Sequence, residues 1–213
     1  MKETFFKLRD TQKFQVLYQL VSVHEASLLQ WITQFEEDFE AEMADRDIRI
    51  NAKKAIQKSF TLLRTIADQQ FSSLASGKLV DKLEAVHEQL AELTMWLEDI
   101  DEIFPASCER EYAPLVALAD LVELVSEYDV EEGSMDDSLA DRVYKIIYLG
   151  AIGSGNKDIP DAAVPGIKGE GGYHYYFHEW ADFNEYVPEN EKLHNKYIAP
   201  LLTRLIAKLN AAG

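Results

Sequence analysis

The chain has a single cysteine, Cys108, in 213 residues, so no disulfide can cross-link it internally. A lone thiol is compatible with a reducing compartment. The sequence also lacks any run of eighteen apolar residues, the length that a membrane-spanning helix requires. Its first ten residues contain no continuous apolar segment of the kind that marks a secretory signal. These absences predict a cytoplasmic protein without a membrane span.

Basic residues are also scarce. The chain has 21 lysines and arginines against 38 aspartates and glutamates, which gives a formal net charge of −17. Binding to nucleic acid relies on Lys and Arg that neutralise phosphates, and anionic lipids attract the same residues. The composition therefore predicts that the partner is neither a nucleic acid nor a membrane. A basic protein, by contrast, would be steered toward this chain.

The acidic excess is concentrated between Arg110 and Arg142, where ten acidic residues occur without a Lys or Arg. Such a stretch is either a solvated face that keeps the protein soluble or a surface for a basic partner, and the sequence leaves both readings open. The candidate partner-binding residues lie in the second half of the stretch: Asp129, Glu131, Glu132, Asp136, Asp137 and Asp141.

Proline is absent from residues 1–104, and Gly77 is the only glycine there. So long a stretch without helix breakers predicts long helices. The expected helices cover about residues 10–38, 47–75 and 79–100. Asp10 or Thr11 is the expected N-cap of the first, and Asp47 is that of the second. Short connections between three long helices favour antiparallel packing in a bundle.

The first of these helices has one polar residue on its apolar stripe. The stripe steps by threes and fours through Phe14, Leu17, Val21, His24, Leu28, Trp31 and Phe35. A histidine in such a position is usually a core residue bonded to a backbone carbonyl or to water, and the alternative is a buried pH-sensitive group. In both cases the spacing predicts that His24 is largely buried.

The elements shorten after Pro105, the one candidate boundary in what we expect to be a single domain, residues 1–213. The expected C-terminal helices cover about residues 114–128, 137–149 and 188–209. Pro114 is expected in the first turn of its helix, where a missing N–H costs nothing, and Pro200 is expected to kink the last helix. The predicted fold class is therefore all-α: three long N-terminal helices extended by shorter C-terminal ones.

Seven of the ten glycines fall between Gly150 and Gly172, which predicts one long Gly-rich loop inside the helical chain. Loops of this kind are usually either functional or disordered, and the aromatic residues that follow argue against disorder. The aromatic segment 173–187 has helical spacing, although its residue types favour a strand locally. We expect a helix, and if its aromatics are exposed they would form the interface of a homo-oligomer.

The same segment contains the candidate metal ligands His174, His178 and Asp182, which a helix would place on one face. Two imidazoles and a carboxylate suit a divalent transition metal such as Zn, Fe or Mn. Glu179 would then be placed to act as a general base on metal-bound water. The His-x-x-x-His spacing resembles the first part of a zincin motif, but Tyr175 replaces its defining glutamate. The other reading is a polar helix face that holds no metal.

Two Glu-x-x-His pairs, Glu84/His87 and Glu191/His194, each match one element of a di-iron carboxylate bundle. Such short matches arise by chance in an acid-rich chain. Glu84 and His87 also flank the apolar stripe of their helix instead of lying on it, so they could face inward only at its edge. The sequence therefore does not predict a di-metal centre.

No complete catalytic motif accompanies the acidic charge. We therefore expect a non-enzymatic interaction protein, such as an inhibitor, an immunity protein or an adaptor, that binds a basic protein partner without a cofactor. The alternative is a metal-dependent enzyme built on His174, His178 and Asp182. A third possibility is a structural subunit whose aromatic segment 173–187 contacts other subunits.

Overall fold

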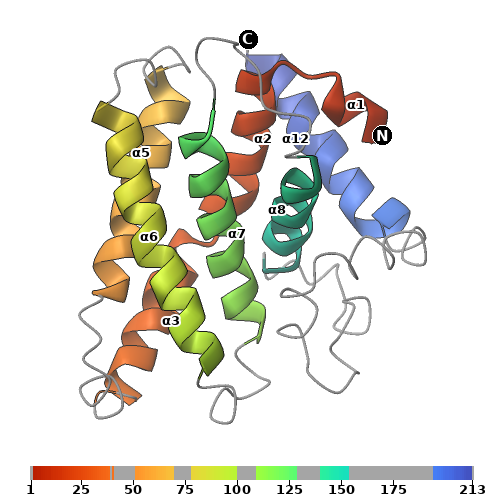
Figure 1. The fold of residues 1–213 in the computed structure, drawn as a ribbon. Coiled ribbons are helices and arrows are strands. Elements are labelled where there is room, and N and C mark those ends of the chain that lie inside the picture. Colours follow the sequence, from red (N-terminus) through yellow and green to blue (C-terminus); the bar gives the residue numbers. More distant parts are fainter. Residues whose placement is uncertain are drawn as a thin grey trace.

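The computed structural model describes residues 2–38, 40, 51–69, 78–99, 109–128, 140–153 and 194–212. Every regular element in these ranges is a helix and none is a strand, which confirms the all-α fold class (Figure 1). Within the same ranges no helix is both long and apolar enough to cross a membrane.

The predicted first helix is two helices. After the single turn α1 (Lys2–Phe6), α2 covers Asp10–Ser22 and α3 covers Glu25–Asp38. At the turn, the N–H of His24 donates to the carbonyl of Val21, 3.1 Å away, and closes α2. The carbonyl of His24 then accepts from the N–H of Leu28 at 2.8 Å and starts α3. The prediction of one continuous helix was wrong, because the apolar stripe continues through the turn without a break.

The predicted phase of that stripe is confirmed. Its apolar members are buried except Trp31, which is partly buried, and His24 is only 2% exposed. The Nε2 atom of His24 lies 2.8 Å from the carbonyl oxygen of Gly150. This is the core histidine bonded to a backbone carbonyl that its position predicts. Val23, which the turn directs outward, is 66% exposed.

The second and third predicted helices are present with different starts. Helix α5 covers Ala52–Gln69 and α6 covers Lys78–Asp99. Asn51, not Asp47, caps α5, because its Oδ1 accepts the N–H of Lys54 at 2.8 Å and satisfies a donor that the first turn leaves free. The apolar stripe of α6 is buried as predicted at Leu83, Val86, Leu90, Leu93 and Leu97.

Helix α7 (Glu109–Ser126) lies at the centre of the fold. It packs against α2, α3, α5 and α6, and against α8 (Ala140–Gly153), and Figure 1 shows it in green between α6 and α8. From Tyr112 to Val125 every residue except Asp120 and Glu123 is buried. A helix that is apolar nearly all round has no face for solvent, so it occupies the interior.

Pro114 lies inside α7, not in the first turn of a helix as predicted. An interior proline costs about 3 kcal/mol, because it removes one backbone hydrogen bond. Burial of a large apolar side chain stabilises by about 1.5–3 kcal/mol. The many buried residues of α7 therefore outweigh the proline, and the helix continues through it.

Helix α8 contains two of the glycines assigned to the predicted loop. Gly150 and Gly153 are helical, so a loop starting at Gly150 was a wrong prediction. Gly150 is buried, and a Cβ atom at that position would meet the Cβ of Leu20 at 3.3 Å. A glycine there lets α8 approach α2 closely. The remainder of the predicted loop and the aromatic segment 173–187 lie outside the described residues.

The C-terminal helix begins irregularly. A π-helical turn, η5 (His194–Ile198), leads into α12 (Ala199–Ala212). The turn ends two residues before Pro200, which has no N–H to bond the carbonyl of the preceding turn. The irregularity lies next to the proline at which the sequence predicts a kink, and the predicted start of this helix at Pro188 lies outside the described residues. Buried residues of α2, α3 and α5 to α8, with those of η5 and α12, form one hydrophobic cluster that spans both sides of Pro105.

Candidate functional site

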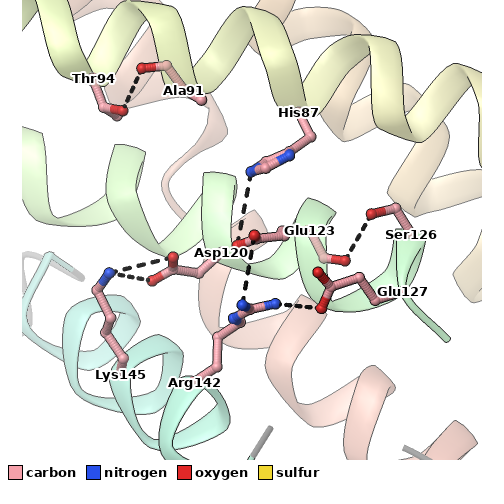
Figure 2. A network of polar contacts seen from close by, with 9 residues as sticks. All are labelled: His87, Ala91, Thr94, Asp120, Glu123, Ser126, Glu127, Arg142 and Lys145. Atoms are coloured by element: carbon pink, nitrogen blue, oxygen red, sulfur yellow. Dashed lines mark hydrogen bonds and ion pairs between the residues drawn. The ribbon is translucent and has the colours of Figure 1, made fainter. Parts of the chain in front are cut away.

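A cluster of polar side chains lies where α6, α7 and α8 meet (Figure 2). Its acidic members, Asp120, Glu123 and Glu127, follow one another along α7 at spacings of three and four residues, so they share one side of that helix. Its basic members come from the neighbouring helices. We call the six residues the polar network: His87, Asp120, Glu123, Glu127, Arg142 and Lys145.

Glu123 is the residue that joins three helices. Its Oε2 atom lies 3.7 Å from Nε2 of His87 on α6, and its Oε1 atom lies 3.5 Å from Nη2 of Arg142 on α8. Arg142 also donates from Nη1 to Oε2 of Glu127 at 2.6 Å, so its guanidinium bridges two carboxylates one turn apart. These side chains are about a quarter to a half exposed, so each contact adds little stability by itself.

Asp120 and Lys145 form the more buried pair of the network. Nζ of Lys145 lies 3.3 Å from Oδ1 and 3.1 Å from Oδ2 of Asp120, and the two side chains are 19% and 13% exposed. Only Oδ1 is oriented to accept a hydrogen bond, so Oδ2 is buried with an ionic contact alone. Burial raises the pKa of Asp120, and the neighbouring ammonium of Lys145 opposes that shift.

The polar network changes the interpretation of the acidic stretch. Between Arg110 and Arg142 the sequence has no base, yet three of the acids there are paired with Arg142 and Lys145 of the next helix. This part of the stretch forms ion pairs between α7 and α8. The matched spacing of the acids on α7 and of the two bases on α8 is a signal that could have revealed the pairing.

The network brings together only one member of the two predicted Glu-x-x-His pairs. His87 faces Glu123, whereas Glu84 is exposed on α6. His194 is the first residue of η5, and Glu191 lies outside the described residues. Across the described ranges, no three His, Cys, Asp or Glu side chains converge in a way that could hold a metal ion.

The remaining predicted site residues are mostly outside the described structure. This holds for Asp129, Glu131, Glu132, Asp136 and Asp137, and also for the metal candidates His174, His178 and Asp182. Asp141 is the second residue of α8, and the structure describes its backbone alone. The predictions that rest on these residues stay predictions.

A second charged feature lies on the outer side of α6. Asp81, Glu84, Glu88 and Glu92 are all exposed and recur every three or four residues, so they form one line along the helix. We call these four residues the acidic face of α6. No other described residue forms an ion pair with them, although the same helix carries Lys78 and Lys82, both exposed. Sequence analysis missed this face, because its acids alternate with the apolar stripe and do not form a continuous run.

Comparison with known proteins adds no relative: no protein-family model, no curated protein and no solved structure matches the chain.

Proposed function

We propose that the protein is a non-enzymatic acidic interaction protein, built on a helical bundle, that binds a basic protein partner as an inhibitor, an immunity protein or an adaptor would. The observation that carries the proposal is the acidic face of α6, whose four carboxylates project into solvent without a paired base among the described residues. The net charge of −17 adds long-range attraction toward a basic protein.

The acidic face of α6 contrasts with the polar network. On α7, each acid of the network has a base from α8 within ion-pair distance. On α6, Glu84, Glu88 and Glu92 follow one another at spacings of four residues, and like charges at that spacing destabilise a helix by about 0.2–0.5 kcal/mol per pair. A partner that placed Lys or Arg along this face would relieve the repulsion, so the charge arrangement favours the bound state.

The test replaces the three glutamates together. Glu84→Gln/Glu88→Gln/Glu92→Gln should slow association with a basic partner about tenfold at low salt and flatten its salt dependence, because rim charges act mainly on the encounter rate. Partners are captured on the immobilised protein from native lysate at low and high salt, and association rates are then measured for each partner found. The free triple variant should also unfold at a slightly higher urea concentration, since two like-charge pairs are removed.

The matched control removes three exposed charges elsewhere in the chain. Glu37→Gln/Asp38→Asn/Glu40→Gln acts at and just beyond the end of α3 and leaves the acidic face of α6 intact, so association should change much less. Equal effects of the two triple variants would show that only net charge matters and would refute a binding role for α6. A third variant, Asp136→Asn/Asp137→Asn/Asp141→Asn, tests the partner surface predicted from the sequence.

The alternative proposal is a metal-dependent enzyme with His174, His178 and Asp182 as ligands, and it rests on their spacing. It predicts that the purified protein holds about one equivalent of a divalent transition metal, measured by mass spectrometry of the metal content. His174→Ala and His178→Ala should each lower that content and should mimic treatment with a chelator. A protein that binds no metal after incubation with Zn, Fe or Mn would exclude this proposal.

The aromatics of 173–187 remain a proposed homo-oligomer interface.

A further inference from the structure

The end of α8 is held by a side chain from a distant part of the chain. The carbonyl of Gly150 lies in the last turn of α8, and Gly150 is buried. The imidazole of His24 donates to this carbonyl from the turn between α2 and α3, with Nε2 at 2.8 Å from the Gly150 oxygen. Because a carbonyl only accepts, Nε2 must carry the proton.

The same turn depends on His24 in two further ways. Its N–H closes α2, and its carbonyl accepts both the N–H of Leu28 and the hydroxyl of Ser27, the latter at 3.0 Å. One buried residue therefore ends α2 and begins α3 through its backbone, and bonds the last turn of α8 through its imidazole. Opening that moves this turn away from α8 brings the imidazole toward water.

We propose that the contact between His24 and Gly150 is a proton-sensitive link, which releases the end of α8 from the α2–α3 turn when the medium is acidified. A neutral ring with its proton on Nε2 satisfies the Gly150 carbonyl at no electrostatic cost. A protonated ring could keep this bond only by burying a full positive charge in a site that is 2% exposed. An opened state that exposes the ring to water avoids that cost, so acid favours opening.

The charged groups around His24 do not compensate such a charge. Glu25, its neighbour on α3, pairs with Arg64 of α5 at 2.6 Å. On α7 and α8, the acids and bases of the polar network are paired with one another. On α12, Arg204 and Lys208 are exposed bases.

Besides Glu25, the chain near the link carries two phenols, Tyr18 on α2 and Tyr148 on α8. The pKa of His24 is lowered by burial, and the hydrogen bond to Gly150 opposes that shift; no carboxylate contributes to it. A position at the carboxyl end of a helix favours a protonated imidazole and so raises its pKa. For His24, burial lowers the pKa by more than such effects raise it.

The direction of the pH effect follows from this shift. A histidine whose pKa is lower in the closed state than in the opened one takes up a proton on opening. The closed state therefore has its full stability above the ordinary histidine pKa of about 6.5. It loses stability as the pH falls from there toward the lowered pKa of the buried ring. For a single proton, the opening equilibrium rises by up to about tenfold per pH unit in this window.

The test is hydrogen exchange of the wild-type protein between pH 7.5 and pH 5, corrected for the intrinsic pH dependence of exchange with an unstructured peptide. We expect protection in the last turn of α8 and at the α2–α3 turn to fall together, by up to about tenfold per pH unit. In His24→Gln the side-chain amide can donate to Gly150 but cannot take up a proton. The fall in hydrogen-exchange protection at low pH should therefore be absent in this variant. Protection that is unchanged by pH in the wild-type protein, or a loss that persists in His24→Gln, would overturn the proposal.

Two further measurements keep the test decisive. His87→Gln removes a partly exposed histidine of the polar network and should leave the pH dependence of the α8 end as in the wild-type protein; if it abolishes that dependence, His24 is not the responsible group. If His24→Gln fails to fold, the titration of the His24 ring is followed by NMR in the wild-type protein. A pKa below 6.5 supports the link, and a pKa at or above 6.5 refutes it.

Discussion

Leu121→Ala in α7 is expected to lower the free energy of unfolding by about 2–5 kcal/mol, the range observed when a buried leucine is truncated. Leu121 is fully buried, and α7 packs against five other helices, so no neighbour can move in to fill the space without displacing another. Because small proteins are stable by only about 5–15 kcal/mol, this loss would remove a large part of the total. Urea unfolding followed by circular dichroism at 222 nm measures it.

The matched control is the same substitution at the edge of the core. Leu209 lies in the last part of α12 and is only partly buried, so Leu209→Ala should cost less than half as much as Leu121→Ala. Similar losses at the two positions would mean that α7 is not the centre of the packing. A third variant, Val23→Ala, changes a side chain that is 66% exposed and should stay within about 0.5 kcal/mol of the wild-type protein.

Lys145→Met is expected to destabilise the protein by about 2–3 kcal/mol at pH 7.5, because it leaves the carboxylate of Asp120 buried without its ion-pair partner. Removing one member of a fully buried pair costs about 3–5 kcal/mol, and the expected value is lower because a fifth of the Lys145 side chain is exposed. The methionine retains most of the buried hydrocarbon of the lysine. The measured effect therefore reports on the charge of Asp120.

The loss caused by Lys145→Met should be smaller at pH 5 than at pH 7.5. Burial raises the pKa of Asp120 above its unfolded value, and the ammonium group of Lys145 lowers it. Removing that ammonium group therefore raises the pKa of Asp120 further. A carboxyl group whose pKa is higher in the folded state binds its proton more tightly there. Its contribution to stability is therefore greatest below the unfolded pKa and is lost as the pH rises through the folded pKa.

Two controls accompany this prediction. Asp120→Asn/Lys145→Met has no carboxylate at position 120 to titrate. Its stability relative to the wild-type protein should therefore vary with pH less than that of Lys145→Met. Arg142→Met removes a more exposed base whose partners are also partly exposed, and it should cost no more than about 1 kcal/mol. A loss from Lys145→Met that is equally large at both pH values would contradict the assignment to Asp120.

Local patterns were sufficient to predict most helical segments and the faces that they bury. The stripe from Phe14 to Phe35 was assigned correctly residue by residue, because side chains three and four positions apart share a helix face whatever the helix packs against. The same argument identified the apolar stripe of α6. The argument failed at the turn between α2 and α3. This turn keeps the apolar stripe in phase, and it contains no glycine or proline that would indicate a helix end.

The candidate site was harder to predict than the fold. Counting charges along the chain made the stretch after Arg110 look uncompensated, because the count stopped where α8 begins. Ion pairs form between residues that are close in space, and Arg142 and Lys145 lie one helix further on. The acidic face of α6 was missed for a related reason: its acids form a line only after the chain is wound into a helix.

By itself, the sequence determined that the described chain is helical, which faces of α2, α3 and α6 are buried, and that the protein is strongly acidic. These properties follow from composition and from spacing within single helices. Only the tertiary structure decided that α7 is central, that three of its acids pair with bases of α8 and that His24 bonds the end of a helix 126 residues away in the chain. Each of these depends on which helices become neighbours. That choice is made by the packing of whole faces against one another, which no local pattern encodes.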